Sequence, residues 1–421
     1  MAIKRRTFIG LVAASSVAPR LFAAETDRLA PVPNATEIGK RLPSWKTGEL
    51  ELHFIHTGRG ENMFYVFPDG TTMVNDTGDY YRPKEVPEMP WLPRADLLGG
   101  ECVARYIGAV WKKTHLDYMA LSHWHADHMG RPSLGSRLTP DRRQVCGLAL
   151  LGETFTFGRF YDHQFPKHGQ YGSQDGDGME MMEAFVAAKK IPQEPFRPGA
   201  LNQIRLLHDA EGQYRDSFSI RNVCANAVCW TGQGEDAVDH GAAHAKATGQ
   251  ASIPNQNTLS MGFVVQYGKF RYWTGGDLSA DLVGADGTPY NYEALVGKRV
   301  GPVTVCKTNH HACKDAMRRA FVGSVRAAAY VTVVWCPRHI QDCNMRDMSS
   351  RDLYPGARMV FPTYVPEWPK KEWPSAAWWR DVAPGGHVVV KVAPGGGRYT
   401  VFLVDASDES LRVKSVWSGI A

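Results

Sequence analysis

The segment Ser-His-Trp-His-Ala-Asp-His-Met-Gly at residues 122–130 restricts the fold more than any other part of the chain. It holds three imidazoles and one carboxylate within six residues, directly after an apolar run typical of a buried strand. Residues two apart on an extended segment project to the same side, so His123 and His125 would point together, with Asp127 and His128 on the following turn. Unpaired buried polar groups are costly, whereas zinc-like cations bind this mixture of nitrogen and oxygen donors well. We therefore expect a buried strand that ends at a metal site.

Apolar patterns elsewhere predict a mixture of strands and helices. Strands are expected at residues 49–57, 63–67, 71–75, 116–121, 258–267, 270–274, 303–306, 330–335, 387–392, 399–404 and 411–416. Helices are expected at residues 94–113 and near 314–326. Strands and helices alternate along the chain without a solenoid or propeller repeat, which favours an α/β layered fold.

The first 24 residues account for most of the net charge. The formal charge is +5, from 48 basic and 43 acidic residues. Residues 1–24 contain four basic residues and no acid, which leaves 44 basic against 43 acidic residues in the rest of the chain. A nearly neutral body gives no strong signal for a nucleic-acid partner.

This N-terminal segment also has the pattern of an export signal. The pair Arg5-Arg6 precedes a weakly hydrophobic run at residues 8–18, which is shorter than the roughly 20 residues that span a bilayer. Small residues follow at Ala23 and Ala24. The segment resembles a twin-arginine signal peptide. The resemblance implies passage through the twin-arginine export machinery and a periplasmic or secreted mature protein without a membrane span.

Three more motifs each lie at or just after an expected strand. Residues 73–78 read Met-Val-Asn-Asp-Thr-Gly and contain Asp76, and residues 274–278 read Thr-Gly-Gly-Asp-Leu and contain Asp277. Residues 306–311 read Cys-Lys-Thr-Asn-His-His and end in the pair His310-His311.

In this order the four motifs resemble the metallo-β-lactamase superfamily. The resemblance implies an αββα sandwich, here with a C-terminal β extension, and two divalent metal ions at its edge, with zinc favoured. It implies the metal ligands His123, His125, Asp127, His128, Asp277 and His311. Asp277 would be shared by the two cations, which suits an anion between two positive charges.

The resemblance also assigns supporting roles. Asp76 would brace the histidine segment from behind the ligands rather than bind metal. His310 would face the substrate as a general acid or hydrogen-bond donor, and Asp127 would orient the attacking water as well as bind metal.

Within the superfamily, the chain looks most like ComEC-type hydrolase domains and secreted phosphodiesterases. The segment from Leu52 to Gly58, the Asn257-x-x-Ser260 pattern and the His pair carry this likeness, which covers roughly residues 49–339. The expected organisation is a signal peptide at 1–24, a linker at 25–48, a hydrolase domain at 49–345, and an aromatic and proline-rich extension with a β meander at 346–421.

Two departures from the family pattern bear on the site. Ala312-Cys313 replaces the usual Gly-Ser after the His pair, and a third histidine for the first metal is not obvious. His240 is a possible additional ligand, with His244 nearby and Asn257 as an alternative group approaching the site. His163, His168 and His208 are less well placed.

The expected activity is hydrolysis by a water that two metals activate, with a phosphodiester as the first choice of substrate. A β-lactam, lactone or thioester is the alternative on the same metal core, and a catalytically inactive metal-binding protein is a further one. The cysteine pairs Cys224/Cys229 and Cys336/Cys343 are possible disulfides, with buried free thiols equally compatible. Residues 175–178, Asp-Gly-Asp-Gly, are expected to form a solvated loop.

Overall fold

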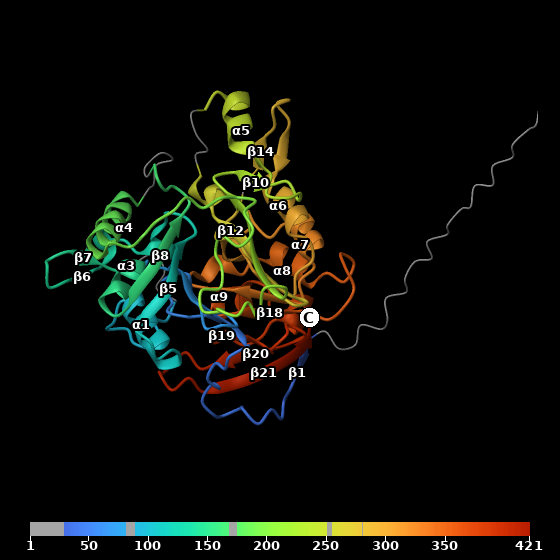
Figure 1. Ribbon diagram of the computed structural model, residues 1–421. Coiled ribbons are helices and arrows are strands. Elements are labelled where there is room, and N and C mark those ends of the chain that lie inside the picture. The colour runs from blue at the N-terminus through green and yellow to red at the C-terminus, as the bar shows by residue number, and fades with distance from the viewer. Residues whose placement is uncertain (1–28, 81–88, 168–174, 251–254, 280) are drawn as a thin grey trace, which may run out of the picture.

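Two large β-sheets form the centre of the molecule (Figure 1). The computed structural model describes residues 29–80, 89–167, 175–250, 255–279 and 281–421. The expected signal peptide at 1–24 lies outside the described residues. The expected α/β fold class is confirmed as a mixed α/β architecture.

The first sheet has nine strands in the order β1-β21-β20-β19-β2-β3-β4-β5-β8. They are β1 (Ala30–Pro31), β2 (Leu50–Phe54), β3 (Asn62–Val66), β4 (Thr72–Thr77), β5 (His115–Leu121), β8 (Thr156–Asp162), β19 (His387–Val392), β20 (Arg398–Val404) and β21 (Val413–Ile420). The neighbours β4, β5 and β8 run parallel, and the other neighbours in this sheet are antiparallel.

The second sheet has eight strands in the order β11-β10-β9-β12-β13-β16-β17-β18. They are β9 (Phe218–Ala225), β10 (Val228–Trp230), β11 (Ala237–Asp239), β12 (Gly262–Tyr267), β13 (Phe270–Thr274), β16 (Val305–Lys307), β17 (Ala329–Thr332) and β18 (Met359–Pro362). Here β13, β16, β17 and β18 run parallel. Two small hairpins are formed by β6 (Arg137–Leu138) with β7 (Gln144–Val145) and by β14 (Asp281–Val283) with β15 (Pro289–Asn291).

The helices are α1 (Gly99–Val110), α2 (Ala126–Met129), α3 (Gly147–Leu150), α4 (Gly176–Lys189), α5 (His240–Thr248), α6 (Tyr292–Val300), α7 (Arg319–Val325), α8 (Asp342–Ser349) and α9 (Glu367–Glu372). Short 3₁₀ turns lie at Pro132–Leu134, Leu151–Glu153, Gln256–Leu259, Asn309–Ala312, Pro337–His339 and Ala377–Asp381. No helix in the described part of the chain has both the length and the apolar character needed to cross a membrane.

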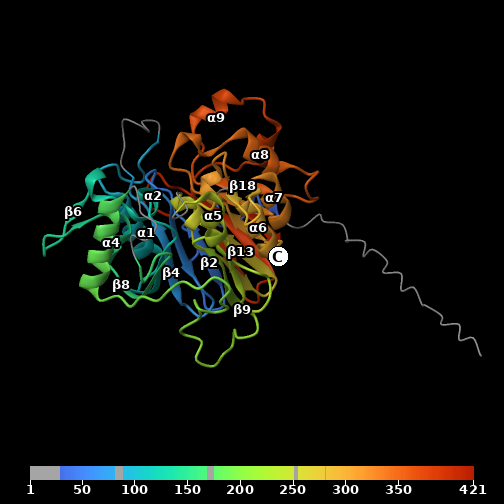
Figure 2. The ribbon, with the colours of Figure 1, turned by 90° about the horizontal axis from the view of Figure 1, so that it is seen from above.

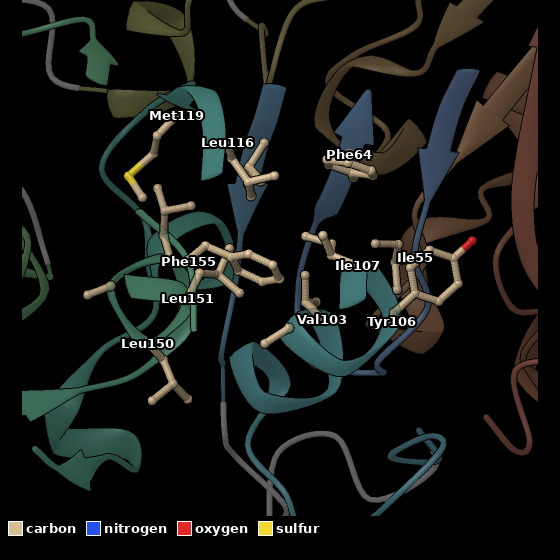
Figure 3. Close-up of a cluster of buried hydrophobic side chains, with 14 of the residues drawn as sticks. Ile55, Phe64, Val103, Tyr106, Ile107, Leu116, Met119, Leu150, Leu151 and Phe155 are labelled. Atoms are coloured by element: carbon tan, nitrogen blue, oxygen red, sulfur yellow. The ribbon is translucent and has the colours of Figure 1, made fainter. Parts of the chain in front are cut away.

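Three clusters of buried apolar side chains separate the layers. Between the sheets, Tyr65 of the first packs with Tyr272 of the second. On the outer face of the first sheet, α1 packs through Val103 and Ile107 (Figure 3). On the outer face of the second, α6, α7 and α8 supply a third cluster that includes Phe321. Figure 2 shows α1 and α4 on the opposite side of the sheets from α6 and α7. Both sheets are thus covered on both faces, as the nearly continuous burial of their strands requires.

Most expected strands are confirmed, and residues 270–274 and 387–392 match β13 and β19 to the residue. The expected helix at 94–113 begins later, at Gly99, where the Asp79 carboxylate accepts the Gly99 amide at 3.0 Å. An acidic group at a helix N-terminus satisfies an amide that has no partner within the helix.

The segment expected to be a C-terminal extension contributes strands to both large sheets. β18 joins the second sheet beside β17, whereas β19 pairs with β2 near the middle of the first sheet. The aromatic stretch between them packs against the second sheet's outer layer, where Trp378 is buried. All eight cysteines are free thiols, including Cys224 and Cys229, which face each other across β9 and β10.

Candidate metal centre

The sequence motifs meet because the parallel strands of both sheets end at one place. In the first sheet, β4 and β5 run parallel, with Asp76 near the end of β4 and the histidine segment directly after β5. In the second sheet, β13 and β16 run parallel and are followed by Asp277 and by the pair His310-His311. Polar groups at the carboxyl ends of parallel strands are well placed to form a site.

Backbone contacts fix the histidine segment against the neighbouring loops. The Asp127 carbonyl accepts the Glu61 amide at 2.7 Å, and the Glu61 carbonyl accepts the Gly78 amide at 2.9 Å. A Cβ at Gly78 would lie 1.9 Å from the Asp127 carbonyl oxygen, so only glycine permits this close approach. The turn after β4 and the turn before β3 thereby hold Asp127 in place.

Three imidazoles are oriented in the same way by bonds to their Nδ1 atoms. His128 Nδ1 lies 3.0 Å from Asp76 Oδ2, His311 Nδ1 lies 2.9 Å from the Val333 carbonyl, and His310 Nδ1 lies 2.8 Å from Asp315 Oδ1. These acceptors favour Nδ1–H and leave each Nε2 to face inward, which is how histidines are usually prepared to bind metal.

Asp277 lies where the Nε2 atoms converge. Its Oδ2 atom is 3.2 Å from His128 Nε2, 3.3 Å from His311 Nε2, 3.8 Å from His310 Nε2 and 3.9 Å from His123 Nε2. One carboxylate oxygen thus lies within reach of four imidazoles, the arrangement expected of a ligand that two cations share.

Imidazole nitrogens and carboxylate oxygens lie close enough here to share one cation, and the ligand atoms of Glu61, His128, Asp277 and His311 all lie within 4.8 Å of one another. His128 Nε2 and His311 Nε2 lie 3.4 and 3.2 Å from Asp127 Oδ2, in addition to their distances of 3.2 and 3.3 Å from Asp277 Oδ2. Ligands about 2.0–2.1 Å from a tetrahedral zinc ion lie about 3.3–3.4 Å from one another. The buried atom His128 Nε2 also makes no hydrogen bond among the described residues, as expected of a nitrogen that binds a cation.

The second donor set is smaller. His123 Nε2 lies 3.0 Å from His125 Nδ1, and Asp277 approaches the same nitrogen. Ser122 Oγ lies 3.1 Å from His123 Nδ1 and 3.3 Å from His128 Nδ1, so it links the two sets. Two imidazoles and the shared carboxylate are thus available to a further cation.

Charge attraction holds together the first donor set, formed by Asp127, His128, Asp277 and His311, even without a metal ion. Burial raises the pKa of Asp127, but His128 outweighs burial and brings that pKa well below its usual value. Burial lowers the pKa of His311, but Asp277 and Asp127 outweigh it and raise that pKa to about 9. A cation that binds these nitrogens must therefore displace protons.

A buried ion pair lies behind the ligands. Lys307 Nζ is 2.6 Å from Glu61 Oε2 and donates to the Gly276 carbonyl at 2.7 Å, and both side chains are completely buried. Lys307 also approaches Asp277 Oδ1 at 3.8 Å, and Glu61 Oε2 lies 3.3 Å from His311 Nδ1. The pair therefore contacts a candidate ligand on each side.

The other candidate histidines do not join the cluster. His240, the possible additional ligand, begins α5 and lies 2.9 Å from the Tyr290 hydroxyl, and His244 accepts the Val283 amide. His208 pairs with Asp117 near the opposite end of β5, and His168 lies outside the described residues.

Two residues from the middle of the chain lie closer to the site than expected. His163 follows β8, whose last residue pairs in register with Leu121, so His163 begins at the same sheet edge as the histidine segment. Its ring nitrogens contact Asn226 Oδ1 and Gln256 Oε1. Asn257 Nδ2 lies 3.2 Å from His310 Nε2, so this amide does approach the site.

The expectation of a solvated loop at residues 175–178 was wrong. Asp175 is buried, its Oδ2 accepts the Ala126 amide at the start of α2, and its Oδ1 pairs with Arg131. Because α2 carries Asp127 and His128, this carboxylate is a second brace of the histidine segment in addition to Asp76. The aspartates looked solvated because their partners are distant in sequence.

Sequence patterns also missed Glu61, Lys307, His339 and Trp335. His339 stacks on His311 with ring centroids 4.5 Å apart, and Trp335 Nε1 lies 3.3 Å from His311 Nε2. The sequence did hold one signal for Lys307, because it is a lysine at the end of an otherwise apolar strand. A lysine buried in this way needs an acidic partner.

Asp76→Asn tests the bracing of the histidine segment. The Asp76 carboxylate accepts both the Ser122 amide at 2.7 Å and His128 Nδ1, and an amide can present only one oxygen to these two groups. We expect zinc affinity to fall by about 10–100-fold, the usual cost of losing such an outer carboxylate. Competition with a zinc chelator measures it, and an unchanged dissociation constant would show that Asp76 does not orient His128.

The sequence matches no protein-family model and no curated protein. The function of the centre is therefore inferred from its residues and their geometry.

Proposed function

We propose that this protein is an exported metal-dependent hydrolase with the αββα sandwich of the metallo-β-lactamase superfamily. The observation that carries the proposal is the buried cluster in which His128 Nε2 and His311 Nε2 each lie 3.2–3.4 Å from a carboxylate oxygen of Asp127 and of Asp277. Glu61, His128, Asp277 and His311 of the same cluster have ligand atoms within 4.8 Å of one another, close enough to hold a metal ion. The layers of helices, sheet, sheet and helices, with the donors at the strand ends, support the family assignment. Export rests on the twin-arginine pattern at residues 5–6.

The residues present fit two divalent cations, with zinc favoured by the nitrogen and oxygen donors. Asp127, His128 and His311 would hold one, His123 and His125 the other, and Asp277 would contact both. When bound, the cations supply a water of lowered pKa and positive charge beside the bond to be cleaved.

His310 is the candidate general acid. Burial lowers the pKa of its imidazole, but Asp277 and Asp315 outweigh burial and raise that pKa. Nδ1–H is held by Asp315, whereas Nε2 is the atom that faces Asp277 and Asn257. With its side chain 22 % exposed, His310 can transfer the Nε2 proton to a leaving-group oxygen.

Asp127 is the candidate for orienting the attacking water. Its side chain is 11 % exposed, whereas those of His128, His311 and Asp277 are 2 % exposed or less. Its carbonyl is fixed by Glu61, so the carboxylate has a defined direction at the accessible side of the centre. An acceptor held in this way favours one orientation of a water molecule.

A phosphodiester is the proposed substrate, and this choice rests on the likeness of the motifs to ComEC-type and secreted phosphodiesterases. A β-lactam, lactone or thioester is the alternative, because the same donors suit attack at a carbonyl carbon. The remaining alternative is that the protein binds metal but catalyses no reaction.

The test is hydrolysis by the zinc-loaded protein of bis-p-nitrophenyl phosphate, nitrocefin and a lactone panel, assayed side by side. We expect turnover of the phosphodiester and its loss after chelation, with recovery when zinc is restored. Turnover of the lactam or a lactone without the phosphodiester would contradict the proposed substrate. Full zinc content without any turnover would indicate a metal-binding protein.

A further inference from the structure

Trp335 lies beside the candidate centre but belongs to none of the motifs that define it. It follows β17 by three residues, two residues after Val333, whose carbonyl accepts His311 Nδ1–H. Its indole is partly exposed, and Nε1 lies 3.3 Å from His311 Nε2. The indole N–H is thus directed at an atom that is a candidate metal ligand.

His311 Nε2 lies between groups that need opposite partners: the carboxylate oxygens of Asp127 and Asp277 need a donor, whereas the Trp335 Nε1–H needs an acceptor. It lies 3.2 Å from Asp127 Oδ2, 3.3 Å from Asp277 Oδ2 and 3.3 Å from the Trp335 donor. A cation that takes the lone pair of this nitrogen removes the acceptor of the indole N–H. The N–H forms no other hydrogen bond to the described residues, so it would need a new acceptor.

Neighbouring rings keep the indole from turning away. Tyr80 packs against Trp335 with centroids 5.0 Å apart, and His339 packs edge-on at 4.9 Å and 88°. His339 in turn stacks on His311 at 7°. Aromatic packing of this kind fixes ring orientation. The direction of the indole N–H is therefore set by packing as well as by its bond to His311.

We infer that Trp335 is a substrate-binding residue whose indole N–H donates to an anionic oxygen of the group being hydrolysed. This inference rests on the proposed metal-dependent function and adds a hydrogen-bond donor to it. An indole N–H can donate but cannot accept, so it requires an acceptor atom and binds most strongly to an oxygen that carries negative charge. A phosphoryl oxygen meets this requirement in both the ground state and the transition state.

Trp335→Phe removes the donor and keeps an aromatic ring in the packing with Tyr80 and His339. The probe is inorganic phosphate, titrated calorimetrically into the zinc-loaded protein. We expect about tenfold weaker phosphate binding, in line with loss of a hydrogen bond to a charged group, with unchanged zinc content. The control is Trp368→Phe, which removes another partly exposed indole located in α9.

The wild-type protein provides a second readout that does not depend on the stability of the variant. Addition of phosphate should change the tryptophan fluorescence of the zinc-loaded wild type, and the change should persist in Trp368→Phe and disappear in Trp335→Phe. Equal phosphate affinities in the wild type and in Trp335→Phe would overturn the inference about Trp335. The proposed hydrolase function would still stand if the wild type hydrolysed the phosphodiester. If the wild type hydrolysed no substrate but Trp335→Phe still bound phosphate more weakly, the proposed hydrolase function would be contradicted. The role of the Trp335 N–H as a donor to phosphate would be supported.

Discussion

Replacing Asp277 by asparagine should lower kcat/KM for bis-p-nitrophenyl phosphate by about 10³-fold or more, since loss of even one preorganised donor costs about 10²–10³-fold. Asp277 Oδ2 is a carboxylate oxygen that approaches imidazoles of both donor sets, from His128 and His311 on one side to His123 on the other. The amide keeps the shape of the side chain but loses the charge that offsets two cations. Zinc content should fall in parallel, as measured by elemental analysis after dialysis.

Asp281→Asn is the matched control for this variant. Asp281 lies four residues further on, is exposed, and pairs with Arg318 at 2.8 Å outside the cluster. It should retain the zinc content and kcat/KM of the wild type. Wild-type zinc content and activity in Asp277→Asn would show that this carboxylate is not a ligand.

Lys307→Met should destabilise the metal-free protein by about 3–5 kcal/mol, the usual cost of removing one partner of a buried ion pair. The lysine lies 2.6 Å from Glu61, both side chains are fully buried, and Glu61 would be left as an uncompensated charge beside His311. Glu61 already has a raised pKa because of burial, which Lys307 partly offsets. Urea unfolding in the presence of a chelator measures the loss.

Two further variants distinguish loss of the buried ion pair from the general effect of removing a positively charged side chain. Glu61→Gln combined with Lys307→Met removes both charges and should recover much of the stability. Arg105→Met breaks the exposed pair Arg105–Glu409, which has the same 2.6 Å separation, and should change stability little. If Lys307→Met were no more destabilising than Arg105→Met, the buried pair would not stabilise the fold.

The local patterns of the sequence were sufficient for the strands that carry the motifs. An apolar run before a dense set of imidazoles predicted β5 and its histidine segment, and short apolar runs before Asp277 and the His pair predicted β13 and β16. Such patterns depend on burial of adjacent residues, which alternation or continuous apolar character makes visible.

Long-range pairing was outside the reach of these patterns. The expected C-terminal meander formed, but its strand β19 pairs with β2, more than 300 residues away in the chain. Strand β8 and its following residue His163 were not anticipated, because parallel pairing with β5 depends on the connection between them rather than on either strand alone.

Contacts between residues distant in sequence also explain which residues of the site the sequence patterns missed. Asp127, His128, Asp277 and His311 were visible as polar residues concentrated in motifs, and the structure brings these four together. Glu61, in the turn before β3, and Lys307, at the end of β16, support that cluster as single charged residues far apart in the chain, and only tertiary structure makes them partners. Asp175 was misjudged because its contact with α2 spans a distance of 49 residues.

The metal content of the protein most directly tests the proposed two-cation centre. Purified protein would be stripped with a chelator, reloaded with zinc, dialysed extensively and analysed by inductively coupled plasma mass spectrometry against protein concentration. The two donor sets that share Asp277 predict two zinc ions per chain. A content of one would contradict the two-cation centre, and a content no higher than that of the dialysis buffer would contradict a metal centre altogether.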